Sequence, residues 1–240
     1  MSASLPITTN AIANALDDSL KSAINNSLTD AGVDLVIFDS DGTLVDSELL
    51  AAEAMVDYAA EFNVVMTVTE IMERFKGGKM ADWVLAMEQL GGAALPESFA
   101  STLRERTAVL FRERLQPIEG ALELVRSLSI PFCLASNGPR DKIELCLGVT
   151  GLLPYFERRI FSAYEVGMWK PEPGLFLHAA EQMGASPSRC IVVEDSVPGA
   201  KAAVAAGMRV FALQTGDVEP GMPAQATVIK RLQELYDHFG

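Results

Sequence analysis

Short apolar runs alternate with helical stretches from residue 33 onward, and this alternation constrains the fold more than any other feature of the sequence. The runs are rich in Val, Ile and Phe, as buried strands are. They span residues 33–38, 130–135, 159–162, 190–193 and 209–213, with a weaker run at 227–229. The helical stretches between them span residues 121–127, 141–147, 173–183 and 199–206. This order predicts an α/β fold, with a Rossmann-like, mostly parallel sheet covered on both faces.

One long block breaks the alternation. Residues 47–117 contain no convincing strand, and helices are expected there at 49–62, 68–75, 80–90 and 96–115. A block of this size after the first strand predicts an inserted α-helical cap domain, with residues 33–46 and 118–240 forming the Rossmann-like core. Residues 1–32 are rich in Ser, Asn, Thr and Ala. We expect them to form a disordered or marginally helical extension outside the fold.

Two aspartates directly follow the first predicted strand, in the string DSDGTLVDSE. Asp39 and Asp41 are two residues apart on a tight turn, so their carboxylates point the same way. Such a pair can hold a hard cation, or one carboxylate can attack while the other moves protons. An Asp/Gly turn without chemistry is the alternative. A calcium-binding EF-hand loop is excluded, because its required Gly and Glu positions are occupied by Leu44 and Leu50.

Two other segments offer groups that suit a phosphate. Ser136 and Asn137 follow the second predicted strand, where a hydroxyl and backbone amides can bind phosphate oxygens. A helix N-cap is the alternative for this pair. Lys170 lies in the string WKPEP, whose two prolines fix the backbone around it. An ammonium group held in this way can neutralise both a phosphate oxygen and an attacking carboxylate.

Two adjacent acids, Glu194 and Asp195, follow the apolar strand at 190–193. Acids in such a position need a cation if they are buried, so they suit a Mg²⁺ site shared with Asp39. The alternative is a helix N-cap with an acidic first turn, which the helix dipole favours.

The strings FDSDGTLVDSE, SNGP, WKPEP and VEDSVPGA resemble the four motifs of the haloacid dehalogenase superfamily, in the same order and each at the end of a strand. The resemblance covers about residues 35–213. The strings RFKG and IEGA add a likeness to bacterial sugar-phosphate phosphatases with a helical cap, and the 6-phosphogluconate phosphatase type is the nearest.

This resemblance implies a mechanism. It implies that Asp39 attacks phosphorus and forms an aspartyl phosphate, and that Asp41 protonates the leaving oxygen and then activates water. It also implies Mg²⁺ as the cofactor, bound by Asp39, the Asp41 carbonyl and Asp195, with Glu194 acting through a water. The residues implied to hold the phosphoryl group are Ser136, Asn137 and Lys170.

The implied substrate is a small phosphorylated metabolite, either a sugar phosphate or a sugar-acid phosphate such as 6-phosphogluconate. Two alternatives stay open: a phosphomutase of the β-phosphoglucomutase type, and a catalytically silent phosphate-binding relative. In the cap, a basic cluster around two glycines is expected to contact the part of the substrate away from the phosphate, unless it is a solvated loop. Its residues are Arg74, Lys76, Gly77 and Lys79.

The composition limits the partners. The net charge is −13 and the pI about 4.6, whereas nucleic acids and anionic membranes require a basic surface. We therefore expect a small-molecule partner and favour a monomer. The three cysteines are widely spaced, which predicts buried thiols in a reducing compartment. With no recognisable secretory signal and no apolar run of about 18 residues, a cytoplasmic enzyme is expected.

Overall fold

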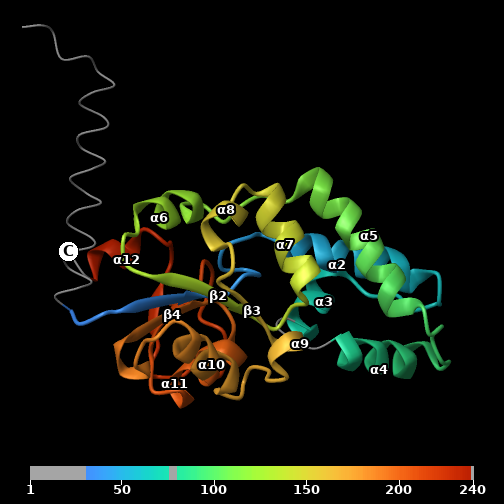
Figure 1. The fold of residues 1–240 in the computed structure, drawn as a ribbon. Coiled ribbons are helices and arrows are strands. Elements are labelled where there is room, and N and C mark those ends of the chain that lie inside the picture. Colours follow the sequence, from blue (N-terminus) through green and yellow to red (C-terminus); the bar gives the residue numbers. More distant parts are fainter. Residues whose placement is uncertain (1–30, 76–79, 239–240) are drawn as a thin grey trace, which may run out of the picture.

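A computed structural model describes residues 31–75 and 80–238 (Figure 1). Its centre is a six-stranded sheet in the order β3-β2-β1-β4-β5-β6, in which all neighbouring strands run parallel. The strands are β1 (Leu35–Phe38), β2 (Phe132–Ser136), β3 (Ile160–Ser162), β4 (Cys190–Glu194), β5 (Arg209–Leu213) and β6 (Thr227–Ile229). The sheet confirms the predicted α/β fold.

Helices cover both faces of this sheet. Successive side chains of β1 point to opposite faces and pack into two different apolar clusters. Val36 and Phe38 pack into the cluster that includes residues of α6 (Ala121–Ser127), α7 (Arg140–Val149) and α8 (Leu153–Phe156). Leu35 and Ile37 pack toward α10 (Gly174–Gln182) and α11 (Val197–Ala205). Figure 1 shows α6 and α8 on one side of the sheet, with α10 and α11 on the other.

Residues between β1 and β2 form a separate group of helices with its own apolar cluster. The helices are α2 (Glu48–Ala60), α3 (Val68–Phe75), α4 (Met80–Gly91) and α5 (Phe99–Arg114). The largest fully buried side chains of the cluster are Met55, Ile71, Met87, Phe99 and Leu103. The separate core supports the predicted division into a catalytic core and a helical cap, which stays a prediction.

The two chain segments that join this helical group to the sheet lie against each other. The Asp46 amide donates to the Gln116 carbonyl at 3.0 Å, and the Ile118 amide donates to the Leu44 carbonyl at 2.9 Å. Between them, Val45 forms an antiparallel bridge with Pro117. The cap helices are therefore attached to the core through one short paired connection beside the end of β1.

The element boundaries differ from the sequence-based expectation by a few residues. The first strand was expected from residue 33 and begins at Leu35, and the fourth cap helix was expected from residue 96 and begins at Phe99. Three helices of four residues each were not predicted: α8, α9 (Ala163–Val166) and α12 (Glu234–Asp237). The expected extension at residues 1–30 lies outside the described residues. All three cysteines are free and buried, as expected.

No helix in the described ranges is long and apolar enough to span a membrane.

Candidate active site

The sheet order brings the segments that carry the predicted site residues together. β1 lies between β2 and β4. From β1 the chain continues to β2 and β3 on one side of the sheet, whereas from β4 it continues to β5 and β6 on the other side. Side chains that follow the strands therefore meet in a crevice at the carboxyl ends, which is where open parallel sheets bind ligands. Lys170 reaches the same place from the loop between α9 and α10. The predicted residues that meet here are Asp39, Asp41, Ser136, Asn137, Lys170, Glu194 and Asp195.

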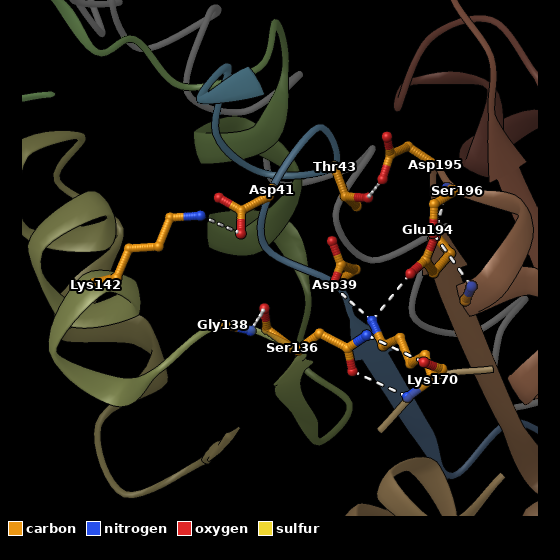
Figure 2. Close-up of polar contacts among 12 residues, drawn as sticks. Asp39, Asp41, Thr43, Ser136, Gly138, Lys142, Lys170, Glu194, Asp195 and Ser196 are labelled. Carbon is orange, nitrogen blue, oxygen red and sulfur yellow. Dashed lines mark hydrogen bonds and ion pairs between the residues drawn. The ribbon is translucent and has the colours of Figure 1, made fainter. Parts of the chain in front are cut away.

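Lys170 is the buried cation at the centre of this group. Its Nζ donates to Asp39 Oδ1 at 2.6 Å and to Glu194 Oε1 at 2.9 Å (Figure 2). All three side chains are at most 9% exposed. Burial alone would lower the pKa of Lys170, but the two carboxylates outweigh burial and raise it. The ammonium group therefore stays charged beside Asp39.

Hydrogen bonds fix the direction of Lys170 and Glu194. The Lys170 amide donates to Asn137 Oδ1 at 3.0 Å, and Asn137 Nδ2 donates to the Lys170 carbonyl at 3.3 Å. The second oxygen of Glu194, Oε2, accepts from the amide and the hydroxyl of Ser196 at 2.6 and 2.9 Å. The Asn137 side chain thus orients the lysine, a role that sequence reasoning did not predict.

Asp39, Glu194 and Asp195 form a buried acidic cluster, with one oxygen of each lying within 4.8 Å of the others. The glycine at position 42 permits this approach. Its φ is +75°, and a Cβ there would lie 2.3 Å from Asp195 Oδ2. Thr43 Oγ1 also donates to Asp195 Oδ1, at 3.4 Å.

The electrostatics of this cluster fit a divalent cation. Burial raises the pKa of Asp39 well above its ordinary value; attraction to Lys170 opposes this rise, and repulsion from Glu194, Asp195 and Asp41 adds to it. Three buried carboxylates beside one ammonium carry excess negative charge, and carboxylate oxygens are the ligands that Mg²⁺ prefers. The donor set therefore fits the predicted metal.

Asp41 is held on the other side of the crevice, away from Lys170. Its Oδ2 accepts from Lys142 Nζ at 2.8 Å, and its Oδ1 accepts from the Ser47 hydroxyl at 2.5 Å. Figure 2 shows Lys142 reaching Asp41 from α7. Burial favours the neutral acid, but the charge and hydrogen bond of Lys142, with that of Ser47, outweigh burial and lower the pKa of Asp41.

Sequence reasoning missed Lys142. The residue lies in the first turn of α7, directly after the Ser136 segment. That position was the available signal, because the first turn of a helix after β2 projects toward the crevice. The neighbouring Ser136 ends β2 and lines the cavity, and its Oγ accepts from the Gly138 amide at 3.1 Å. Its hydroxyl proton can thus point toward a ligand.

Above the acids lies a cavity of about 370 Å³ between the sheet and the cap helices. Its side toward the cap helices is mostly apolar, and aromatic side chains from these helices and from the core border it. The cap residues that line it include Ile71, Met72, Met80, Trp83, Leu103, Arg104, Thr107, Phe111 and Arg112. Tyr164 and Trp169 lie on the core side, with ring centres 6.0 Å apart.

The basic residues predicted to contact the substrate from the cap are not found in the described lining of the cavity. Arg74 is exposed at the end of α3, and the described lining of the cavity does not include it. Lys76, Gly77 and Lys79 lie outside the described residues. The predicted role of this cluster in contacting the substrate therefore stays a prediction.

Comparisons with known proteins identify similar sequences and structures. A family model described as haloacid dehalogenase-like hydrolase matches residues 33–207. The 6-phosphogluconate phosphatase of Escherichia coli K12 is 39% identical over 180 residues, covering 75% of this chain and 81% of the relative.

Two solved structures share the fold. A haloacid dehalogenase-like protein of Agrobacterium tumefaciens is 35% identical, with a TM-score of 0.74 and coverage of 86% of this chain and 97% of the other. A structure described as a putative β-phosphoglucomutase of Thermotoga maritima is 26% identical, with a TM-score of 0.70 and coverage of 86% and 98%.

Proposed function

The chain belongs to the haloacid dehalogenase-like hydrolases, and on that basis we propose that it is a Mg²⁺-dependent phosphatase of a small phosphorylated metabolite. The substrate is a sugar phosphate or a sugar-acid phosphate such as 6-phosphogluconate. One observation carries the proposal: the buried carboxylate of Asp39 lies 2.6 Å from the Lys170 ammonium group, on the floor of a cavity that Asp41 also lines.

In the first step, an Asp39 oxygen attacks phosphorus, and the bond from phosphorus to the ester oxygen breaks. Asp41 gives its proton to the departing oxygen, so an alcohol leaves and an aspartyl phosphate remains on Asp39. Lys170 and the Ser136 hydroxyl hold the phosphoryl oxygens and offset the negative charge. Fixed donors of this kind cost little reorganisation during the reaction.

In the second step, Asp41 takes a proton from water, and the water oxygen attacks phosphorus. The bond from phosphorus to Asp39 breaks, phosphate leaves, and both aspartates return to their starting state. Lys142 lowers the pKa of Asp41 in the ligand-free protein, which favours the basic form needed here. A phosphate dianion in the cavity would raise the pKa again, which favours the acid form needed in the first step.

The proposed Mg²⁺ ligands are the carboxylates of Asp39 and Asp195 and the main-chain carbonyl of Asp41. Glu194 belongs to the same acidic cluster, but its oxygens accept from Lys170 and Ser196. We therefore assign it indirect contact with the metal. Bound Mg²⁺ supplies positive charge against the transferring phosphoryl group.

Phosphate release tests the function. Purified protein is incubated with p-nitrophenyl phosphate, glucose 6-phosphate and 6-phosphogluconate. We expect release with Mg²⁺, none with EDTA, and recovery with Mg²⁺ but not with Ca²⁺, which prefers longer bonds and more ligands. Asp39→Asn should abolish release while circular dichroism stays unchanged. Substantial turnover by that variant would show that Asp39 is not the nucleophile.

The same samples separate the two alternatives. A phosphomutase would convert a sugar 1-phosphate into its 6-phosphate with little release of phosphate, and nuclear magnetic resonance of phosphorus distinguishes the two products. A catalytically silent relative would bind phosphate without turnover. The complete set of Asp39, Asp41 and Lys170 in one cavity supports an active enzyme.

The proposal also includes the setting of the enzyme. We place it in a reducing compartment such as the cytoplasm, which the free, buried state of the three cysteines supports.

A further inference from the structure

Helix α5 carries four arginines that divide into two pairs, each with a spacing of eight residues. Arg106 and Arg114 form one pair, and Arg104 and Arg112 form the other. Eight residues correspond to a little over two helical turns, so the members of each pair lie on the same side of the helix. The two pairs have different surroundings.

The first pair holds α5 against α2. Arg106 donates to both oxygens of Glu61, at 2.6 and 3.3 Å, and its guanidinium group lies 4.1 Å from the ring centre of Tyr58. Arg114 donates to both oxygens of Glu53, at 2.6 and 3.2 Å. These two arginines are therefore satisfied by the protein.

The second pair lines the cavity. Arg104 donates to the Tyr164 hydroxyl at 3.4 Å, across the opening between cap and core. Neither Arg104 nor Arg112 forms a salt bridge within residues 31–75 and 80–238. The chain has 32 acidic residues against 19 basic ones, so two arginines without a carboxylate partner on one wall of the active-site cavity call for an explanation.

The charges around the cavity indicate which kind of substrate group this wall would bind. The acids that line it lie on the core side or at Glu48, where α2 begins. The rest of the described cap lining is apolar, apart from Ser47, Thr107 and these arginines. An anionic group on a substrate would be repelled by the acids below but attracted by guanidinium groups above. A guanidinium group binds a carboxylate through two parallel hydrogen bonds.

We propose that Arg104 and Arg112 form the binding site for a carboxylate at the end of the substrate away from the phosphate. The substrate class is then a phosphate monoester of a hydroxy acid, with the phosphate on Lys170 and the carboxylate on α5. This inference rests on the proposed function and adds the residues that select among phosphate esters. The apolar wall between the two ends excludes water from the carbon chain.

A matched pair of ligands tests the inference. 6-Phosphogluconate and glucitol 6-phosphate have the same open six-carbon chain and the same phosphate, and differ at C1, where one has a carboxylate and the other a hydroxymethyl group. We expect wild-type kcat/KM to favour the acid by at least about tenfold, since a charge-assisted bidentate contact is worth that much. Arg104→Met and Arg112→Met should each reduce this preference by about tenfold, mainly through KM.

The chain supplies the controls. Arg106→Met and Arg114→Met remove the same charge from the same helix but should leave the preference unchanged. Arg104→Lys should retain part of it, because a point charge replaces the bidentate contact. Because the measured quantity is a ratio of two substrates on one protein sample, partial misfolding of a variant does not change it.

Binding to the inactive Asp39→Asn protein, measured by calorimetry, gives the same comparison without turnover. Equal affinity for both ligands, or a preference that survives both Met substitutions, would overturn the inference. Hydrolysis of p-nitrophenyl phosphate alongside that result would leave the phosphatase function intact. Absence of all hydrolysis, with a preference for the acid that both substitutions reduce, would instead overturn the proposed function and support the carboxylate site.

Discussion

At the scale of single residues, the two aspartates of the first motif have opposite electrostatic surroundings although they are two residues apart. Asp39 is buried among other acids, and its pKa is raised. Asp41 contacts Lys142 and Ser47, and its pKa is lowered. An ionised nucleophile and a protonated general acid require the opposite shifts, which a cation beside Asp39 and a phosphate dianion beside Asp41 would produce. Lys142 of α7 contributes to this difference between the two aspartates, because it lowers the pKa of Asp41.

Lys142→Met tests this role. We expect kcat for an alkyl phosphate to fall by about tenfold or more, part of the 10²–10⁴-fold that a positioned acid–base supplies. The loss should be smaller for p-nitrophenyl phosphate, because its leaving group needs less protonation. Lys142→Arg should restore part of the activity on the alkyl substrate. Equal losses on both substrates would show that Lys142 supports the structure without positioning Asp41.

At the scale of elements, α11 approaches the site so closely that its first turn needs a glycine. A Cβ on Gly199 would lie 1.7 Å from Glu194 Oε1, the oxygen that holds Lys170. Any side chain at this position must displace either the carboxylate or the helix. Gly199 of α11 thus allows Glu194 to hold Lys170, in addition to allowing close packing of the helix on the sheet.

Two substitutions of the same kind should have opposite effects. Gly199→Ala should lower both the melting temperature and kcat/KM, because it forces Glu194 away from Lys170. Gly148→Ala, in α7, should raise stability by up to about 1 kcal/mol, because a helical glycine is entropically costly and a Cβ there would meet only Leu153 at 3.9 Å. Thermal melts of both variants make the comparison. Normal activity in Gly199→Ala would show that Glu194 can move without consequence.

A surface ion pair links two further elements. Arg140 of α7 donates to both oxygens of Glu165 in α9, at 2.5 and 2.6 Å. The hydrogen bond from Arg140 lowers the pKa of Glu165. The carboxylate is 47% exposed, so solvent screens the pair, and we expect Glu165→Gln to cost at most about 1 kcal/mol at pH 7.

The pH dependence of that cost has a defined sign. Because the pKa of Glu165 is lower in the folded protein, the stability it contributes is present above its unfolded pKa and is lost as the pH falls through the folded value. Urea unfolding of both proteins at pH 7 and again in acid should therefore show a difference that disappears in acid. A stability difference that persists in acid would show that Glu165→Gln acts through packing and not through the ion pair.

The elements also show how far sequence reasoning reached. The strands of the sheet and the long helices follow from apolar periodicity, and the residues at the ends of β1, β2 and β4 followed from the strand assignments. The helices α8, α9 and α12 have four residues each, too few for a helical period to be visible. The contacts of Asn137 with Lys170, and of Lys142 with Asp41, join residues 33 and 101 positions apart, and only the folded chain brings these together.

At the scale of the whole molecule, three apolar clusters stabilise the fold, and the acidic cluster lines the cavity between the sheet and the cap helices. Buried like charges oppose folding unless a cation neutralises them. The site is thus a place where the protein gives up stability for activity, as active sites commonly do.

Asp195→Asn should reveal this trade-off. In EDTA the variant should melt at a higher temperature than the parent, because one buried charge is removed. Mg²⁺ should stabilise the parent, by about 2.7 kcal/mol when its concentration is 100 times the Kd, since it binds only the folded state. The variant should show little of that gain. The exposed Asp217→Asn serves as the control for loss of charge and should respond to Mg²⁺ as the parent does. If Mg²⁺ stabilised the Asp195 variant as much as the parent, the metal would have to bind elsewhere, because removing a proposed ligand from a three-carboxylate cluster cannot leave its affinity unchanged.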